Sequence, residues 1–184
     1  MNDLFILGKI IKEDKKAIAV VGSRRMSLRG ESLTKEFVRE LVKNNFTIVS
    51  GLARGIDTVA HKTALESGGR TIAVLGSGLD TIYPPENKTL SEEIVNHGAL
   101  VSPFPYGTKP IGKNFLARNK IVVSLSQAVL VIEGERRSGT LSTASWAANL
   151  GIDVYAVPGS PATDWLIEEG ANSVELPNEL IEKL

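Results

Sequence analysis

The sequence predicts an α/β fold, namely a doubly wound, mostly parallel sheet with helices on both faces. Short runs rich in valine and isoleucine recur along the chain and are almost continuously apolar, which is typical of parallel strands buried on both faces. Segments with the apolar spacing of helices separate these runs, so right-handed crossovers should connect the strands. With 184 residues, 42% of them hydrophobic and 23% charged, the chain has the size and composition of one globular domain.

Six strands are predicted in chain order. Each is a run of mostly Val, Ile, Ala or Leu that closes on Gly or Ser, residues that punctuate the end of a strand. The predicted strands span residues 17–22, 46–51, 71–76, 99–102, 128–134 and 153–159.

Four segments between these strands are predicted to form helices. In 31–44, Leu33, Phe37, Leu41 and Val42 fall along one stripe, and lysines and glutamates occupy the rest of the surface. The segments 57–68, 115–127 and 141–151 show similar spacing.

Two irregular stretches, 76–88 and 102–114, are dense in Pro, Gly and Asn and follow predicted strands. They should therefore be loops at the carboxyl edge of the sheet, where open α/β folds bind ligands. We divide the chain into an N-terminal extension (1–16), the α/β domain (17–171) and a C-terminal tail (172–184).

Composition limits the classes of function. Lys plus Arg and Asp plus Glu both number 21, so the net charge gives no sign of a polyanionic partner, although many basic residues stand in or beside Gly- and Ser-bearing corners. The alternative is that these bases lie on a solvated surface. The absence of cysteine and the presence of only two histidines argue against a disulfide or a zinc site. Without a signal peptide or an apolar run of about 18 residues, we expect a cytoplasmic protein with no membrane partner.

The first predicted strand ends in Gly22-Ser23, which Arg24 and Arg25 follow before a helix begins near Gly30. Glycine lets backbone N–H groups approach an anion, the serine hydroxyl adds a donor, and the helix N-terminus adds partial positive charge. An arginine can then bind a phosphate through two hydrogen bonds. The pattern is neither the dinucleotide-binding G-x-G-x-x-G nor a Walker A loop.

The corner after the second strand, "VSGLARGIDTVAH" at 49–61, repeats this design with Gly51, Arg54 and Gly55. Arg54 is predicted to face the same cleft. Asp57 and His61 stand one helical turn apart on one face, so a hydrogen bond between them is expected. We interpret this pair as structural rather than catalytic, because no serine or cysteine nucleophile is spaced to use it.

Two further segments complete the predicted site. Ser138, Gly139 and Thr140 open a helix with hydroxyls and free N–H groups. Lys113, Arg118 and Asn119 flank Phe115, and a basic groove beside an aromatic ring is typical of single-strand binding, with charge for the backbone and ring faces for the bases. Alternatively, Phe115 packs in the core, and the stacking ring is one of the loop aromatics Tyr83, Phe104 and Tyr106.

These motifs, in this order, resemble the DNA-processing protein A family, known as DprA or Smf, and its extended Rossmann-like domain. The resemblance extends over about residues 17–171, the segment WLIEEGA at 165–171 included. The matching motifs are VGSR (21–24), SGLARGID (50–57), AH (60–61), TIAVLGSGLDTIYPPEN (71–87), RNKI (118–121), SGTLSTA (138–144) and VPG (157–159).

The resemblance implies a protein that binds and protects single-stranded DNA, forms a homodimer and helps to load the RecA recombinase in natural transformation or recombination, with no cofactor, metal or catalytic residue. Many members carry a small helical domain before this part and a winged-helix domain after it, and we expect neither here. The DNA-contacting residues that the resemblance implies are Gly22, Ser23, Arg24, Gly51, Arg54, Gly55, Lys113, Arg118, Asn119, Ser138, Gly139 and Thr140.

Two other classes of function remain open at this point. One is a phosphoribohydrolase-like nucleotide-processing enzyme, whose signature P-G-G-x-G-T-x-x-E would align its Gly-Thr with Gly139-Thr140 but would place Thr143 where the glutamate should be. Glu133 could supply the carboxylate that such chemistry needs. The other is a sensor domain that binds a small nucleotide in the same cleft.

Overall fold

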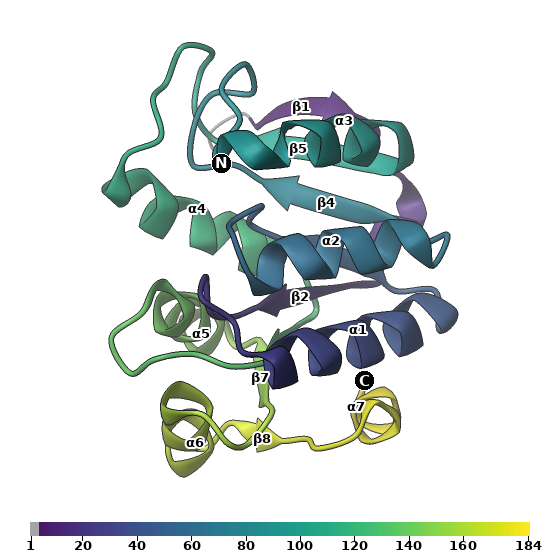
Figure 1. Cartoon of the computed structure of the whole chain (residues 1–184), viewed down its shortest axis with the longest axis vertical. Coiled ribbons are helices and arrows are strands. Elements are labelled where there is room, and N and C mark those ends of the chain that lie inside the picture. The colour runs from purple at the N-terminus through teal and green to yellow at the C-terminus, as the bar shows by residue number, and fades with distance from the viewer. Residues whose placement is uncertain (1–3) are drawn as a thin grey trace.

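Residues 4–184, described by a computed structural model, form one eight-stranded sheet with helices on both faces, as predicted (Figure 1). The strand order is β1-β5-β4-β3-β2-β6-β7-β8, and every neighbouring pair is parallel except β1 with β5. The strands are β1 (Phe5–Gly8), β2 (Ala17–Val21), β3 (Thr47–Ser50), β4 (Thr71–Val74), β5 (Gly98–Ser102), β6 (Ala128–Val131), β7 (Asp153–Ala156) and β8 (Asn172–Ser173).

Helices connect the strands and cover both faces of the sheet. Apolar residues of α1, α2 and α7 pack on one face, and those of α4, α5 and α6 pack on the other. The helices are α1 (Leu28–Lys43), α2 (Ile56–Glu66), α3 (Lys88–His97), α4 (Gly112–Ser124), α5 (Gly139–Leu150), α6 (Pro161–Glu168) and α7 (Pro177–Lys183), with short 3₁₀ turns η1 (Lys12–Lys15) and η2 (Pro85–Asn87). None of these helices combines the length and the apolar character that crossing a membrane requires.

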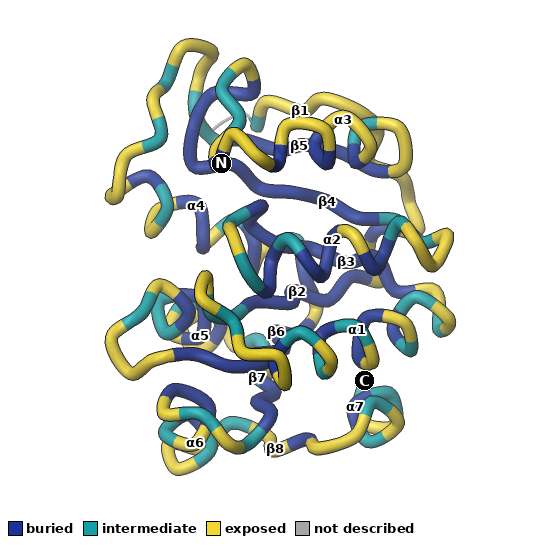
Figure 2. The backbone as a smooth tube through the Cα atoms, viewed as in Figure 1, coloured by how far each residue is buried: buried dark blue, intermediate teal, exposed yellow. Residues whose placement is uncertain are grey.

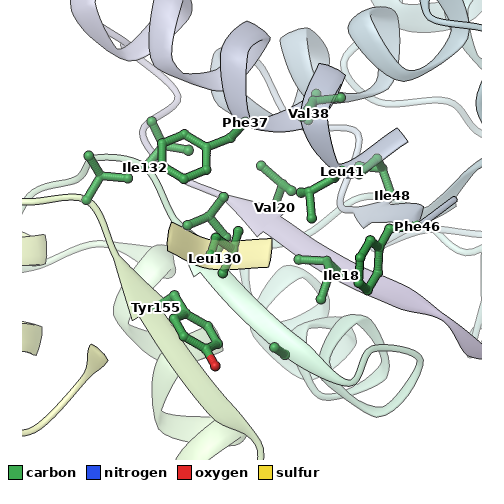
Figure 3. Packing of buried hydrophobic residues seen from close by; sticks show 14 of the residues in the cluster. Ile18, Val20, Phe37, Val38, Leu41, Phe46, Ile48, Leu130, Ile132 and Tyr155 are labelled. Carbon is green, nitrogen blue, oxygen red and sulfur yellow. The ribbon is translucent and has the colours of Figure 1, made fainter. Parts of the chain in front are cut away.

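The central strand β2 shows why its sequence is apolar throughout. Ile18 and Val20 point towards α1, where they meet Phe37 and Leu41 (Figure 3). The alternate alanines and Val21 pack under α4 and α5. Side chains alternate between the two faces of a strand, so a strand with helices on both sides has no polar face. Figure 2 shows the central strands buried and β1 exposed at the edge of the sheet.

Both ends of the chain add strands that the sequence did not predict. Phe5–Gly8 pairs antiparallel with β5, and Asn172–Ser173 pairs parallel with β7. All four residues of β1 are exposed, so neither burial nor alternation marks the segment as a strand. Its position depends on backbone hydrogen bonds to β5, which local sequence does not reveal.

The direction of the crossovers reverses between β2 and β6. From β2 the chain runs through α1 to β3 on one side, whereas β6, the neighbour of β2 on the other side, leads through α5 to β7. The loops after β2 and β6 therefore diverge at the carboxyl edge of the sheet. Such a switch point is where open α/β sheets leave a crevice for ligands.

Candidate functional site

A hollow of about 690 Å³ opens at this switch point, between the loops after β2 and β6 and the start of α4. We call it the switch-point hollow. It collects most of the residues that the sequence predicted as a phosphate or nucleic-acid site. Those residues are Gly22, Ser23, Arg24, Arg25, Phe115, Arg118, Asn119, Ser138, Gly139 and Thr140, and the lining also includes Ala53, Asp57, Leu116, Glu135 and Thr143.

The other four predicted residues lie elsewhere. Arg54 and Gly55 line a second hollow of about 450 Å³, which we call the α1–α2 hollow because Glu31, Lys35, Lys62 and Glu66 of those helices line it. Gly51 is buried beneath Arg118, and Lys113 is exposed in the first turn of α4 next to the lining residue Gly112.

Backbone hydrogen bonds to neighbouring segments hold the corner after β2 in place. The Ser23 N–H donates to the carbonyl of Glu133 (3.0 Å), and the Ser23 carbonyl accepts from the Ile56 N–H (3.1 Å). The Ser23 hydroxyl accepts from the Arg25 N–H (3.1 Å). The Ser23 amide therefore joins the end of β2 to the segment after β6, and the corner presents arginine side chains to the hollow.

Arg118 forms the floor of the switch-point hollow. Its side chain is buried, its Nη2 lies 4.0 Å from Asp57 Oδ2, and its Nε has no hydrogen-bond partner among residues 4–184. Burial lowers the pKa of Arg118; Asp57 opposes this effect, and the nearby charge of Arg24 adds to it. A buried guanidinium with a free N–H, next to a second guanidinium, favours the binding of an anion.

Gly51 is explained by Arg118. A Cβ atom at Gly51 would overlap the Arg118 guanidinium, so only glycine lets that group lie flat on the end of β3. The Gly51 N–H donates instead to Asp57 Oδ2 (3.1 Å), which also accepts from the Ala53 N–H (3.3 Å). Burial raises the pKa of Asp57, while Arg118 and these amides lower it. Asp57 thus orders the corner after β3.

The N-terminus of α5 faces the same hollow. Ser138 is its N-cap residue, and the buried Ser138 hydroxyl has no hydrogen-bond partner within the described part of the chain. The Asn119 side-chain amide donates to the Gly139 carbonyl (3.2 Å) and so joins α4 to this end of α5. A helix N-terminus carries partial positive charge, so a free hydroxyl beside it adds a second donor for an anion.

The mouth of the hollow carries a cation and an aromatic ring. The exposed Arg24 guanidinium lies 5.4 Å from the centre of the Phe115 ring, which is half-buried in the lining and so not confined to the core. Among the lining residues, the positive charges of Arg24, Arg25 and Arg118 outnumber the negative charges of Asp57 and Glu135. The hollow can therefore hold a phosphate and a flat ring together.

Arg54 departs most from the sequence prediction. Its guanidinium does not face the switch-point hollow but forms an ion pair with Glu86, with Nη2 3.2 Å from Oε2, and lies 5.9 Å from the centre of the Tyr83 ring. Hydrogen bonding to Arg54 lowers the pKa of Glu86. Glu86 was not predicted, because it lies 32 residues from Arg54 and no local pattern links the two.

The predicted Asp57–His61 hydrogen bond is also absent from the described residues. His61 Nδ1 lies 2.7 Å from the Thr71 hydroxyl, which itself donates to the Ile48 carbonyl (2.8 Å). Nδ1 must therefore carry the proton, and His61 Nε2 is buried with no partner in the stretch that the structure describes. The histidine is neutral and connects α2 to β4.

We expect the fold to lose stability as the pH falls below about 6.5, the ordinary pKa of histidine. Burial, and after it the charge of Arg118, lowers the pKa of His61 to about 3. Between these values the unfolded chain binds a proton that the folded chain does not, so stability decreases by about 1.4 kcal/mol per pH unit. Urea unfolding at about pH 7 and about pH 5 measures this slope, which His61→Gln should reduce by about one proton. The same slope in both proteins would contradict the assignment.

Comparison with known proteins bears on this site. The family model described as "DNA recombination-mediator protein A" matches residues 2–184. Protein Smf of Escherichia coli strain K12 is 45% identical over 188 residues, which cover 98% of this chain and 50% of that protein. The chain spans about half the length of the curated relatives that it matches.

Two solved structures are similar over 98% of this chain. The X-ray structure of DNA processing protein A (DprA) from Streptococcus pneumoniae superposes with a TM-score of 0.93 at 40% identity and is covered to 66%. The structure of DNA processing protein A from Helicobacter pylori superposes with a TM-score of 0.90 at 32% identity and is covered to 85%. The latter structure is described as giving insight into a "unique single-stranded DNA binding mode".

Proposed function

Because the chain belongs to the DNA recombination-mediator protein A family, we propose that it binds single-stranded DNA in the switch-point hollow. One observation carries the proposal. Buried donors without partners, on Arg118 and Ser138, lie in the same hollow as a stacked cation and ring, Arg24 and Phe115. The donors suit a phosphate, the ring suits a base, and a single strand offers both at each step.

Each residue would contact the part of the strand that suits its chemistry. Arg118 Nε and the Ser138 hydroxyl would donate to a phosphate at the floor, supported by the positive end of α5. Arg24 would bind a neighbouring phosphate at the mouth, and Phe115 would stack on a base. The Helicobacter pylori relative, a DNA processing protein A described as binding single-stranded DNA, supports single-stranded DNA as the ligand.

The position of Glu133 favours binding over hydrolysis. One carboxylate oxygen accepts from the Ser27 N–H (2.7 Å) and the other accepts from the Ser27 hydroxyl (2.6 Å), so Glu133 holds Ser27, the N-cap residue of α1. Its carboxylate therefore has a structural task and is not among the groups that line the switch-point hollow. We accordingly propose a binding protein rather than a phosphoribohydrolase-like enzyme.

We expect the protein to bind oligo-dT more tightly than duplex DNA or mononucleotides, and Arg24→Ala to weaken that binding at least about tenfold, or about 1.4 kcal/mol, through loss of a charge-assisted contact. Arg24 is exposed, so the variant should keep the native fold. Each phosphate contact should add about 0.7 to the slope of log affinity against log salt. Fluorescence anisotropy with the three ligands at several salt concentrations measures all of these quantities.

Arg39→Ala is the matched control, because Arg39 is an exposed arginine of α1 that lines neither hollow. If single-stranded and duplex DNA bind equally, or if Arg24→Ala binds like Arg39→Ala, the proposal is wrong. Tighter binding of a mononucleotide than of oligo-dT would instead favour a nucleotide sensor.

Protection of the bound strand, homodimer formation, assistance to RecA and a cytoplasmic location belong to the same proposal and come from the family resemblance. Nuclease digestion of labelled oligo-dT tests protection, and light scattering during size exclusion tests dimer formation. The rate of RecA filament assembly on oligo-dT that carries the bound protein tests assistance to RecA.

A further inference from the structure

Cations and aromatic rings alternate along a row that leaves the switch-point hollow. Arg24 lies 5.4 Å from the Phe115 ring centre, Phe115 lies 5.6 Å from Tyr83 between ring centres, and Tyr83 lies 5.9 Å from the Arg54 guanidinium. Each neighbouring pair is within the range of a cation–π or ring–ring contact. The row joins the switch-point hollow to the edge of the α1–α2 hollow, which Arg54 lines.

The far half of the row is held firmly but remains accessible. The Asn87 side-chain amide donates to the Leu52 carbonyl (3.0 Å) and to the Thr58 hydroxyl (2.8 Å), which fixes the loop of Tyr83 and Glu86 against the corner that carries Arg54. Tyr83 nevertheless remains 38% exposed. A rigid, exposed ring beside a guanidinium repeats the arrangement of Phe115 and Arg24.

Glu86 makes the Tyr83–Arg54 half of the row different from the Arg24–Phe115 half. It pairs with Arg54 where both side chains are about half exposed, so the carboxylate occupies the position that a phosphate would take at this guanidinium. Arg24 has no such pairing among the ion pairs of residues 4–184. An exposed ion pair is weak, so a polyanion already anchored nearby can displace it.

We propose that Tyr83 and Arg54 form a second nucleotide subsite, which takes a base and a phosphate further along the strand, and that Glu86 restricts this subsite by competing for Arg54. The inference rests on the proposed binding of single-stranded DNA in the switch-point hollow. Short strands would occupy only that hollow, whereas longer strands would reach Tyr83, exchange Glu86 for a phosphate and gain affinity.

The test is a length series of oligo-dT, from about 4 to about 16 nucleotides, the range of site sizes of single-strand-binding folds. Dissociation constants are measured for the full chain and for Tyr83→Leu, Arg54→Gln and Glu86→Gln. We expect Tyr83→Leu to weaken binding of the longer strands about fivefold or more, through loss of one stacked base. Arg54→Gln should lower the salt slope for the longer strands by about 0.7. Glu86→Gln should strengthen their binding about two- to fivefold, by removal of an exposed ion pair.

Two controls match these variants. Phe5→Leu removes an aromatic ring with nearly the same exposure, 37%, on the edge strand β1 and outside both hollows. Glu66→Gln removes one negative charge from the α1–α2 hollow without touching the Arg54–Glu86 pair. All of these side chains are exposed, and equal thermal midpoints would confirm that the variants fold.

The outcomes distinguish a failure of the proposed function from a failure of the second subsite alone. If the unmodified chain binds no oligo-dT, the proposed function fails and the second subsite fails with it. If it binds, but the three variants match the controls at every length, the second subsite is wrong while the proposed function stands. Effects confined to the longer strands, with Glu86→Gln opposite in sign to Arg54→Gln, would support the inference.

Discussion

Replacing Arg118 with methionine should weaken single-stranded DNA binding at least about tenfold and destabilise the fold by about 3–5 kcal/mol. The guanidinium is buried beside Asp57, and Asp57 is itself buried. Removal of the cation leaves a buried carboxylate without its counter-charge, which is far more destabilising than the loss of an exposed ion pair. The pKa of Asp57, already raised by burial, should rise further.

Urea unfolding and oligo-dT titration measure the two effects, and a double variant, Asp57→Asn with Arg118→Met, separates them. Removing the carboxylate charge should recover much of the lost stability but none of the lost binding. The assignment of Arg118 to the binding site would be contradicted if the double variant regained both, since the binding defect would then follow from unfolding alone.

Gly55→Ala should destabilise the fold by about 3 kcal/mol or more, through backbone strain and overlap together. Gly55 has a φ of 75°, and a Cβ atom there would overlap the Ser23 carbonyl oxygen and come within 2.9 Å of the Arg24 backbone. The corners after β2 and β3 touch at this position, so the substitution must push them apart. The Ile56 N–H, which donates to Ser23, would then lose its partner.

Gly139→Ala provides the contrast for this prediction. Gly139 begins α5, and a Cβ atom there meets no other atom within 4 Å. Alanine is the better helix former, so this variant should keep or raise the stability by up to about 1 kcal/mol. Thermal unfolding compares the two. Equal midpoints for Gly55→Ala and the unmodified chain would show that the two corners are not packed as described.

The sheet could be predicted from the sequence because its strands are buried on both faces. The runs at 17–22 and 128–134 became β2 and β6 with the boundaries shifted by at most a few residues. Burial on both faces makes a strand continuously apolar, and this pattern is visible locally. The edge strand β1 has only a short apolar run, Phe5 to Leu7. Its four residues are exposed, and its pairing with β5 joins chain segments far apart, so local sequence did not predict it.

The sequence predicted which corners at the strand ends would contribute to the site, but not where each side chain points. Glycine, serine and arginine at strand ends correctly indicated the switch-point hollow. Arg54 stands in a motif of the same kind, yet its side chain turns to Glu86, a partner set by packing between distant loops. Similarly, helical spacing placed Asp57 and His61 on one face, but Asp57 bonds to Gly51 and Ala53 and His61 to Thr71.

The hydrogen bonds of Glu133 to Ser27 and Ser23 affect the expected kinetics of binding. Its carboxylate fixes the start of α1 through Ser27, and its carbonyl fixes the Ser23 amide, so one residue just after β6 clamps the corner after β2. A ligand entering the hollow therefore meets a corner after β2 that is already assembled, and we expect no slow closure before contact. Association should then proceed at the rate of encounter, and substitutions in the floor should act mainly by shortening the lifetime of the complex.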